Sequence, residues 1–109
     1  MSNGFYIKQN GTVPFAEWFG SLRDVNAKIW IDKRLERVSS GNLGDCRSVG
    51  EGVCELKIDY GAGYRVYFGQ VDLRSCFCCA VGIKERKDRD ISNAKEYWRD
   101  YEIRQSADQ

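Results

Sequence analysis

The sequence predicts an α+β fold in which helices pack on an antiparallel sheet of about four strands. Apolar residues recur at helical spacing in the N-terminal part and near the C-terminus, and the segment between them holds short β-rich runs separated by turn residues. In a chain with helices, then strands, then a helix, each helix buries its apolar face against the same sheet. The 109 residues fit a single domain over 1–109, with an ordered core expected at about 5–103.

The N-terminal part predicts a short strand and then a helical hairpin. Residues 5–8 form the strand, and Pro14 suits the first turn of the helix that follows. Asp24 is a suitable cap for a second helix, and Gly41 is suited to end it. The apolar faces of the two helices are formed by Phe15, Trp18, Phe19 and Leu22 and by Ala27, Ile31, Leu35 and Val38. Trp30 lies off the second face, so partial exposure on a partner surface and packing in the core remain equal alternatives.

The rest of the chain predicts a meander of three antiparallel strands and a final helix. The strands are residues 53–59, 64–68 and 74–81, linked by turns at 61–63 and 70–73. Asp90 or Ser92 is expected to cap the helix, whose polar tail should fray after Ile103. The apolar face of this helix is formed by Ile91, Ala94, Trp98 and Tyr101.

Composition and charge exclude several classes of function. The chain has 17 Lys and Arg against 16 Asp and Glu, and this balance argues against a general nucleic-acid coat or a polybasic membrane binder. It has no histidine, which excludes Ser-His-Asp triads, Cys-His dyads and histidine-containing metal sites. No apolar run approaches the ~20 residues of a membrane span, and the N-terminus lacks the pattern of a secretion signal. A cytoplasmic protein with no membrane contact is therefore expected.

The five cysteines are interpreted as buried thiols in preference to a zinc site. Cys46 and Cys54 are widely spaced, whereas Cys76, Cys78 and Cys79 are too close together for a standard zinc-binding pair. The last three also lie in an apolar run of strand length, where a free cysteine acts as a small hydrophobic residue. We expect no metal and no cofactor.

Two basic clusters are candidates for contacts with RNA. Lys57 and Arg65 flank the turn at 61–63, and four further cations follow the third strand of the meander: Lys84, Arg86, Lys87 and Arg89. If the clusters converge near the strand tyrosines, they form a positive, aromatic surface suited to single-stranded RNA. The tyrosines are Tyr60, Tyr64 and Tyr67. Alternating charges such as those of residues 84–90 are more often a solvated face or the start of a helix.

One long run of the sequence resembles a known toxin family. Residues 55–68 read Glu-Leu-Lys-Ile-Asp-Tyr-Gly-Ala-Gly-Tyr-Arg-Val-Tyr-Phe, and this run resembles the RelE/ParE toxin superfamily, most closely its HigB-like, phage-derived addiction module killer branch. Pro14-Phe15 followed by Trp18, and the segment 89–98, resemble the same branch. The resemblance covers roughly residues 5–101.

The resemblance implies the toxin of a bacterial type II toxin–antitoxin system. Such toxins commonly cut mRNA in the ribosomal A site, which inhibits translation and arrests growth. It also implies a cognate antitoxin, often a helix-turn-helix protein, as a partner besides mRNA and the ribosome. The cleavage needs no metal, because the 2′-hydroxyl of one nucleotide attacks the adjacent phosphate while cations neutralise the developing charge.

The resemblance also assigns roles to residues. Arg65 matches the phosphate-binding arginine of the family, Lys84 falls where a second cation is taken to protonate the leaving group, and Arg86 matches a further basic position. The residues expected to contact RNA are Lys57, Tyr60, Tyr64 and Lys87. The base remains open among Tyr60, Tyr64, Glu55 and Asp90. Two alternatives to an endoribonuclease remain: a non-catalytic, ParE-like inhibitor of DNA gyrase, and a degenerate relative that binds only its antitoxin.

Overall fold

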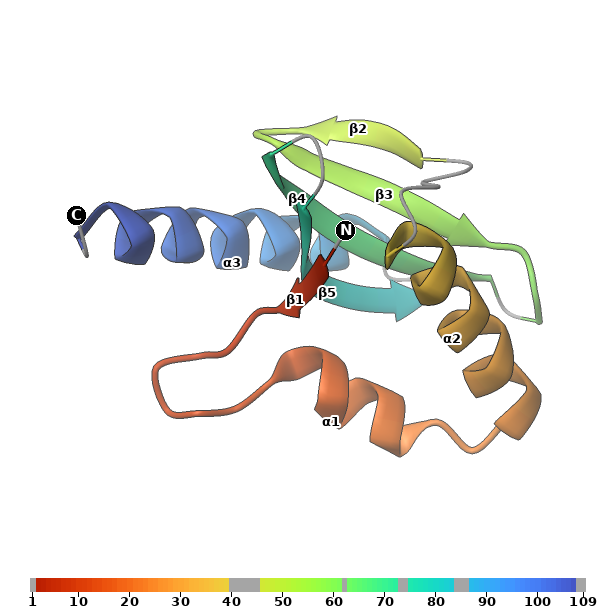
Figure 1. Cartoon of the computed structure of the whole chain (residues 1–109). Coiled ribbons are helices and arrows are strands. Elements are labelled where there is room, and N and C mark those ends of the chain that lie inside the picture. The colour runs from red at the N-terminus through yellow and green to blue at the C-terminus, as the bar shows by residue number, and fades with distance from the viewer. Residues whose placement is uncertain (1, 40–45, 62, 73–74, 84–86, 108–109) are drawn as a thin grey trace.

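The structure, a computed structural model, describes residues 2–39, 46–61, 63–72, 75–83 and 87–107. Within these ranges the chain forms five strands and three helices, in the order β1, α1, α2, β2, β3, β4, β5, α3. The strands form one sheet in the order β1-β5-β4-β3-β2, with α1 and α2 on one face and α3 on the other (Figure 1). The α+β fold, with its N-terminal helical hairpin and C-terminal helix, is therefore confirmed. No helix in the described ranges is long and apolar enough to cross a membrane.

The first strand lies earlier in the chain than the sequence predicts. β1 (Ser2–Phe5) shares only Phe5 with the predicted strand at 5–8. The chain turns after this point, because the Lys8 N–H donates to the Thr12 carbonyl and the Gly11 N–H donates to the Lys8 carbonyl. Gly11 has the positive φ of 90° that such a turn favours. β1 pairs in parallel with β5, so the sheet consists of four antiparallel strands with one parallel strand at its edge.

The helical hairpin begins where the sequence predicts. α1 (Pro14–Ser21) starts at its proline, and α2 (Val25–Ser39) follows directly after Asp24. The Asp24 carboxylate accepts hydrogen bonds from the backbone N–H groups of Asn26 and Ala27, at 3.0 and 3.3 Å, and therefore caps α2 as expected. The predicted stop at Gly41 lies outside the described residues.

The meander has longer strands than predicted and an additional strand before it. β3 (Val53–Ile58) is close to the prediction. β4 (Tyr64–Asp72) extends through most of the predicted turn at 70–73, and β5 (Ser75–Ile83) continues past its predicted end at residue 81. The prediction of a turn is wrong for residues 70–72, because Gln70 still pairs with Cys76 and Asp72 pairs with Ser75. β2 (Cys46–Gly50) was not predicted and pairs antiparallel with β3.

The sheet separates two hydrophobic cores. On the face covered by α1 and α2, Leu56 and Val66 pack with Ile31 and Val38 of α2. On the opposite face, α3 (Lys87–Ala107) covers a smaller core of Val53, Tyr67, Ala94 and Trp98. The alternation of side chains along β3 produces both cores, because residues 53 and 55 point to one face while 56 and 58 point to the other. The core positions predicted for Trp18 and Trp98 are confirmed.

The C-terminal helix exceeds its predicted limits at both ends. It begins at Lys87, so Asp90 lies within its first turn and neither Asp90 nor Ser92 is the residue that precedes the helix. It also continues past Ile103, where the sequence predicts a frayed tail, and reaches Ala107. The extension is wrongly predicted because Arg104 has, besides Asp100 one turn before it, a partner far away in sequence. Its guanidinium binds the Asp100 carboxylate and donates to the Ile7 carbonyl.

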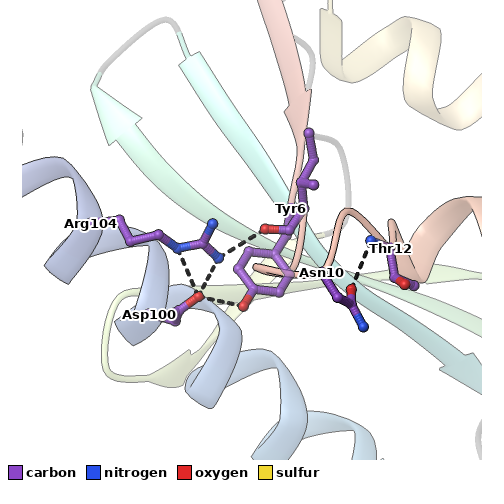
Figure 2. Close-up of polar contacts among 6 residues, drawn as sticks. Tyr6, Asn10, Thr12, Asp100 and Arg104 are labelled. Atoms are coloured by element: carbon purple, nitrogen blue, oxygen red, sulfur yellow. Dashed lines mark hydrogen bonds and ion pairs between the residues drawn. The ribbon is translucent and has the colours of Figure 1, made fainter.

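An N-terminal clamp, formed by Tyr6, Asp100 and Arg104, ties the chain after β1 to α3 (Figure 2). The Tyr6 hydroxyl donates to the Asp100 carboxylate at 2.5 Å, and the Tyr6 ring stacks on Tyr97 with 4.7 Å between ring centroids. Figure 2 shows both side chains of α3 converging on Tyr6. The clamp therefore couples the order of the C-terminal helix to that of the N-terminal segment.

The clamp predicts a dependence of stability on pH at the alkaline limit. Burial first, and then the Asp100 carboxylate, raise the pKa of Tyr6 from 10.0 to about 12. A raised pKa stabilises the fold below pH 10, and that contribution is lost as the pH rises from 10 to about 12. We expect Tyr6→Phe to reduce the loss of unfolding free energy across this pH range, measured by urea denaturation at both limits. Tyr97→Phe is the matched control, and an unchanged loss in Tyr6→Phe would contradict the assignment.

Candidate functional site

Three neighbouring strands align Lys57, Arg65 and Gly82 in one row across the sheet. Lys57 on β3 stands opposite Arg65 on β4, and Arg65 stands opposite Gly82 on β5. Residues directly opposite each other share a face of the sheet, so this row lies on the face that α3 covers. The next pair along, Tyr64 and Ile83, is the last pair between β4 and β5. The row thus lies at the end of the sheet from which the chain leaves β5.

Arg65 forms a buried ion pair with Glu55. Its Nη1 atom lies 2.6 Å from Glu55 Oε1, and the exposed fraction of the two side chains is 10% for Arg65 and 0% for Glu55. A second arginine, Arg47 on β2, approaches the same oxygen at 3.4 Å and is 54% exposed. A buried charge is costly unless it is paired, so each member of the Arg65–Glu55 pair makes the burial of the other tolerable.

Tyr67 and Asp90 complete the buried polar group, which we call the Arg65 cluster: Glu55, Arg65, Tyr67 and Asp90. Burial raises the pKa of the Tyr67 hydroxyl above its ordinary value, and the carboxylates of Glu55 and Asp90 raise it further. Arg65 opposes this effect. Tyr67 therefore remains protonated across the physiological pH range. Its hydroxyl is buried and has no hydrogen-bond partner among the described residues.

A glycine on β5 makes room for the acidic member that comes from α3. A side chain at position 82 would overlap the Asp90 carboxylate, so Gly82 allows this carboxylate to lie directly against the strand beside Arg65. Asp90 lies in the first turn of α3, where the helix dipole favours a negative charge. The N-terminus of α3 and the ends of β4 and β5 therefore meet at the Arg65 cluster.

The other predicted site residues are not gathered at this cluster. Lys57 is exposed beside Arg65, as an RNA contact requires. Tyr60 is half-buried, donates to the Asp24 carboxylate at 3.1 Å and stacks against Trp30. Tyr64 packs in the core against the edge of Trp18, on the opposite face of the sheet, so its burial does not support the RNA contact expected of it. Lys84 and Arg86 lie outside the described residues, and Lys87 is the first residue of α3.

Sequence reasoning did not identify the ion pair that holds Arg65. Glu55 was considered only as a candidate base, and Arg47 was not singled out because β2 was not predicted. The signal for Glu55 was present in the strand Val53–Ile58. An acidic residue two positions before Lys57 occupies the same face as Arg65, on the neighbouring strand. Its burial depends on α3, which is distant in sequence and supplies Asp90 and Trp98 to this face.

The arrangement is suited to holding an anion at the end of the sheet. A guanidinium has five N–H donors, and among the described residues its hydrogen bonds join Arg65 to Glu55. Glu55 fixes the orientation of the group and occupies part of its donors, and the Asp90 carboxylate lies beside it. The donors that remain can hold a phosphate at the end of the sheet, and exposed Lys57 on β3 adds a second positive charge. Within the described ranges, no three His, Cys, Asp or Glu side chains are grouped so that they could hold a metal ion.

Fold and site together define an α+β protein with a buried, ion-paired arginine at one end of its sheet. The chain is 39% identical over 89 residues to an uncharacterized protein of Haemophilus influenzae, and the match covers 82% of this chain and 90% of that protein. The chain belongs to the same family as this Haemophilus protein. No family model matches the chain, and no solved structure matches it significantly.

Proposed function

We propose that this protein is the toxin of a type II toxin–antitoxin system and acts as an mRNA interferase, cutting mRNA on the ribosome. The observation that carries the proposal is the row of Lys57, Arg65 and Gly82, which leads along β5 towards Lys84 and Arg86 in the sequence. The resemblance of residues 55–68 to RelE/ParE toxins, and an α+β fold compatible with theirs, support it further. The partners proposed with this function are a helix-turn-helix antitoxin, mRNA and the ribosomal A site.

The proposed chemistry is an internal transesterification at phosphorus. The 2′-oxygen of one nucleotide loses its proton to a base and bonds to the adjacent phosphorus, while the bond from phosphorus to the 5′-oxygen breaks and that oxygen gains a proton. The phosphorane that forms carries additional negative charge, which the Arg65 guanidinium, oriented by Glu55, would stabilise. Lys84 is proposed to protonate the leaving oxygen and Arg86 to add positive charge. Products are a 2′,3′-cyclic phosphate and a 5′-hydroxyl.

The proposal predicts the loss of mRNA cleavage in two variants. Arg65→Lys and Lys84→Ala should each reduce cleavage of a reporter mRNA by at least about 100-fold, since each loses stabilisation of the developing charge. Primer extension after brief induction measures the new 5′ ends, and growth is followed in parallel. Arg65→Lys is preferred to Arg65→Ala because it keeps a cation beside buried Glu55.

The control is Arg99→Gln, which removes a cation on the exposed side of α3 that pairs with Glu51. This variant should cleave like the wild type, and circular dichroism should show that all variants are folded. Full cleavage by Arg65→Lys and Lys84→Ala would overturn the proposed mechanism. Growth arrest with intact mRNA would instead favour the gyrase inhibitor, an alternative that the burial of Arg65 also fits. The absence of both arrest and cleavage would leave antitoxin binding as the function.

A further inference from the structure

A basic groove lies between α2 and the end of β3. Its volume is about 190 Å³. The residues that line it and that matter here are Trp30, Lys33, Arg34, Arg37, Lys57 and Asp59. Figure 1 shows α2 beside the end of β3. Lys57 lines this groove at the end of β3, whereas Arg65, its partner in the row, lies on the face that α3 covers.

The cations of this groove lack acidic partners within the described part of the chain. None of Lys33, Arg34, Arg37 and Lys57 takes part in the salt bridges found there, and Asp59 is the acidic residue among the lining side chains. Like charges four residues apart on a helix, such as Lys33 and Arg37, destabilise that helix slightly. A stripe of this kind is stabilised when an external anion binds to it.

Trp30 gives the groove an aromatic surface. It lies on the same face of α2 as the three helix cations, since residues 30, 33, 34 and 37 follow the spacing i, i+3, i+4, i+7. Trp30 is 50% exposed, which is unusual for tryptophan. Its ring stacks near Tyr60, at 6.3 Å between centroids, and the two rings together form a partly exposed platform.

We propose that this groove binds single-stranded RNA, with Arg34 and Arg37 on the phosphates and a base stacked on Trp30. Arginine holds phosphate through two parallel hydrogen bonds, and an exposed indole stacks on any base. An acidic peptide would satisfy the cations but makes no use of the aromatic platform. That the bound strand also passes around the end of β3, past Lys57, to reach Arg65 on the other face of the sheet rests on the proposed function. Binding in the groove itself does not.

Binding is measured with a substrate that this chemistry cannot cleave. The probe is a short fluorescein-labelled single-stranded RNA of mixed sequence in which every ribose is 2′-O-methylated, and the signal is fluorescence anisotropy at about 50 to 200 mM salt. We expect Arg34→Gln/Arg37→Gln to weaken binding at least about tenfold and to reduce the slope of log K against log salt by roughly 1.4, about 0.7 for each phosphate that the protein no longer neutralises. The charge-matched control, Arg23→Gln/Arg99→Gln, should change neither the affinity for RNA nor the salt slope by a comparable amount.

The aromatic part of the proposal has a test of its own. Trp30→Leu should weaken binding by about tenfold and should have no effect on an abasic strand of the same length, because that strand has no base to stack. Absence of RNA binding by the wild type, or equal loss in the control variant, would overturn the proposal. Tighter binding of polyglutamate than of RNA, with no dependence on Trp30, would also overturn it and indicate an acidic protein partner. Because no cleavage is involved, these outcomes are independent of the mRNA interferase assay.

Discussion

Replacement of Glu55 by leucine is expected to lower the free energy of unfolding by about 3–5 kcal/mol. Glu55 is fully buried and holds Arg65, whose side chain is 10% exposed, at 2.6 Å. The leucine removes this negative charge and leaves the buried guanidinium without the carboxylate that contacts it at 2.6 Å. Since Arg65 cannot lose its proton in the physiological pH range, the protein must either bury this charge or open the sheet near α3.

Urea denaturation of three further variants tests this explanation. Arg47→Gln removes the exposed partner at 3.4 Å and should cost no more than about 1 kcal/mol. Glu55→Gln keeps the shape and an oxygen acceptor for Arg65, so its cost should lie between those of Arg47→Gln and Glu55→Leu. Glu55→Leu/Arg65→Leu should be more stable than Glu55→Leu alone, because it no longer buries a guanidinium without the Glu55 carboxylate.

The double variant is the decisive comparison. If Glu55→Leu/Arg65→Leu is less stable than Glu55→Leu, the ion pair is not the source of the cost, and Arg65 contributes through its packing instead. A cost below about 1 kcal/mol for Glu55→Leu would contradict the burial of the pair itself. Either result would also change the proposed function, in which Glu55 orients Arg65 toward the substrate.

Local patterns were sufficient to predict most of the fold. Pro14 and Asp24 set the starts of α1 and α2. A first-turn proline and a side-chain cap both act on neighbouring residues, so a local pattern is enough to predict them. β2 and the last turn of α3 were missed for the opposite reason. β2 contains few apolar residues and is stabilised by pairing with β3, and the end of α3 is held by contacts with the chain near Ile7.

The candidate site was predictable only in part. The turn after β3 forces Lys57 and Arg65 onto neighbouring strands, so their adjacency follows from the sequence. The burial of Arg65 does not follow from the sequence, because the helix that covers this end of the sheet, α3, lies at the other end of the chain. The cations of α2 lie off its apolar face in the sequence, and their grouping with Lys57 in one groove emerges only when α2 is placed against β3.

Gly69→Ala is expected to lower the free energy of unfolding by about 2–3 kcal/mol, which corresponds to roughly 10–15 °C in the melting temperature. Gly69 lies in the middle of β4, buried beneath the Trp98 indole of α3, and a Cβ at this position would overlap the ring. The indole must shift or α3 must lift from the sheet. The sequence placed this glycine just beyond the predicted strand, although glycine within a strand often marks such a close approach.

A double-mutant cycle with Trp98 separates this steric effect from the general effect of alanine in a strand. In the background of Trp98→Leu, which removes the ring, Gly69→Ala should cost less than about 1 kcal/mol. Gly20→Ala is the matched control, because a Cβ on this exposed helical glycine meets nothing within 4 Å. It should raise stability by about 0.5–1 kcal/mol through the helix preference of alanine. An equal cost of Gly69→Ala in both backgrounds would mean that the backbone of β4, and not the contact with Trp98, requires glycine.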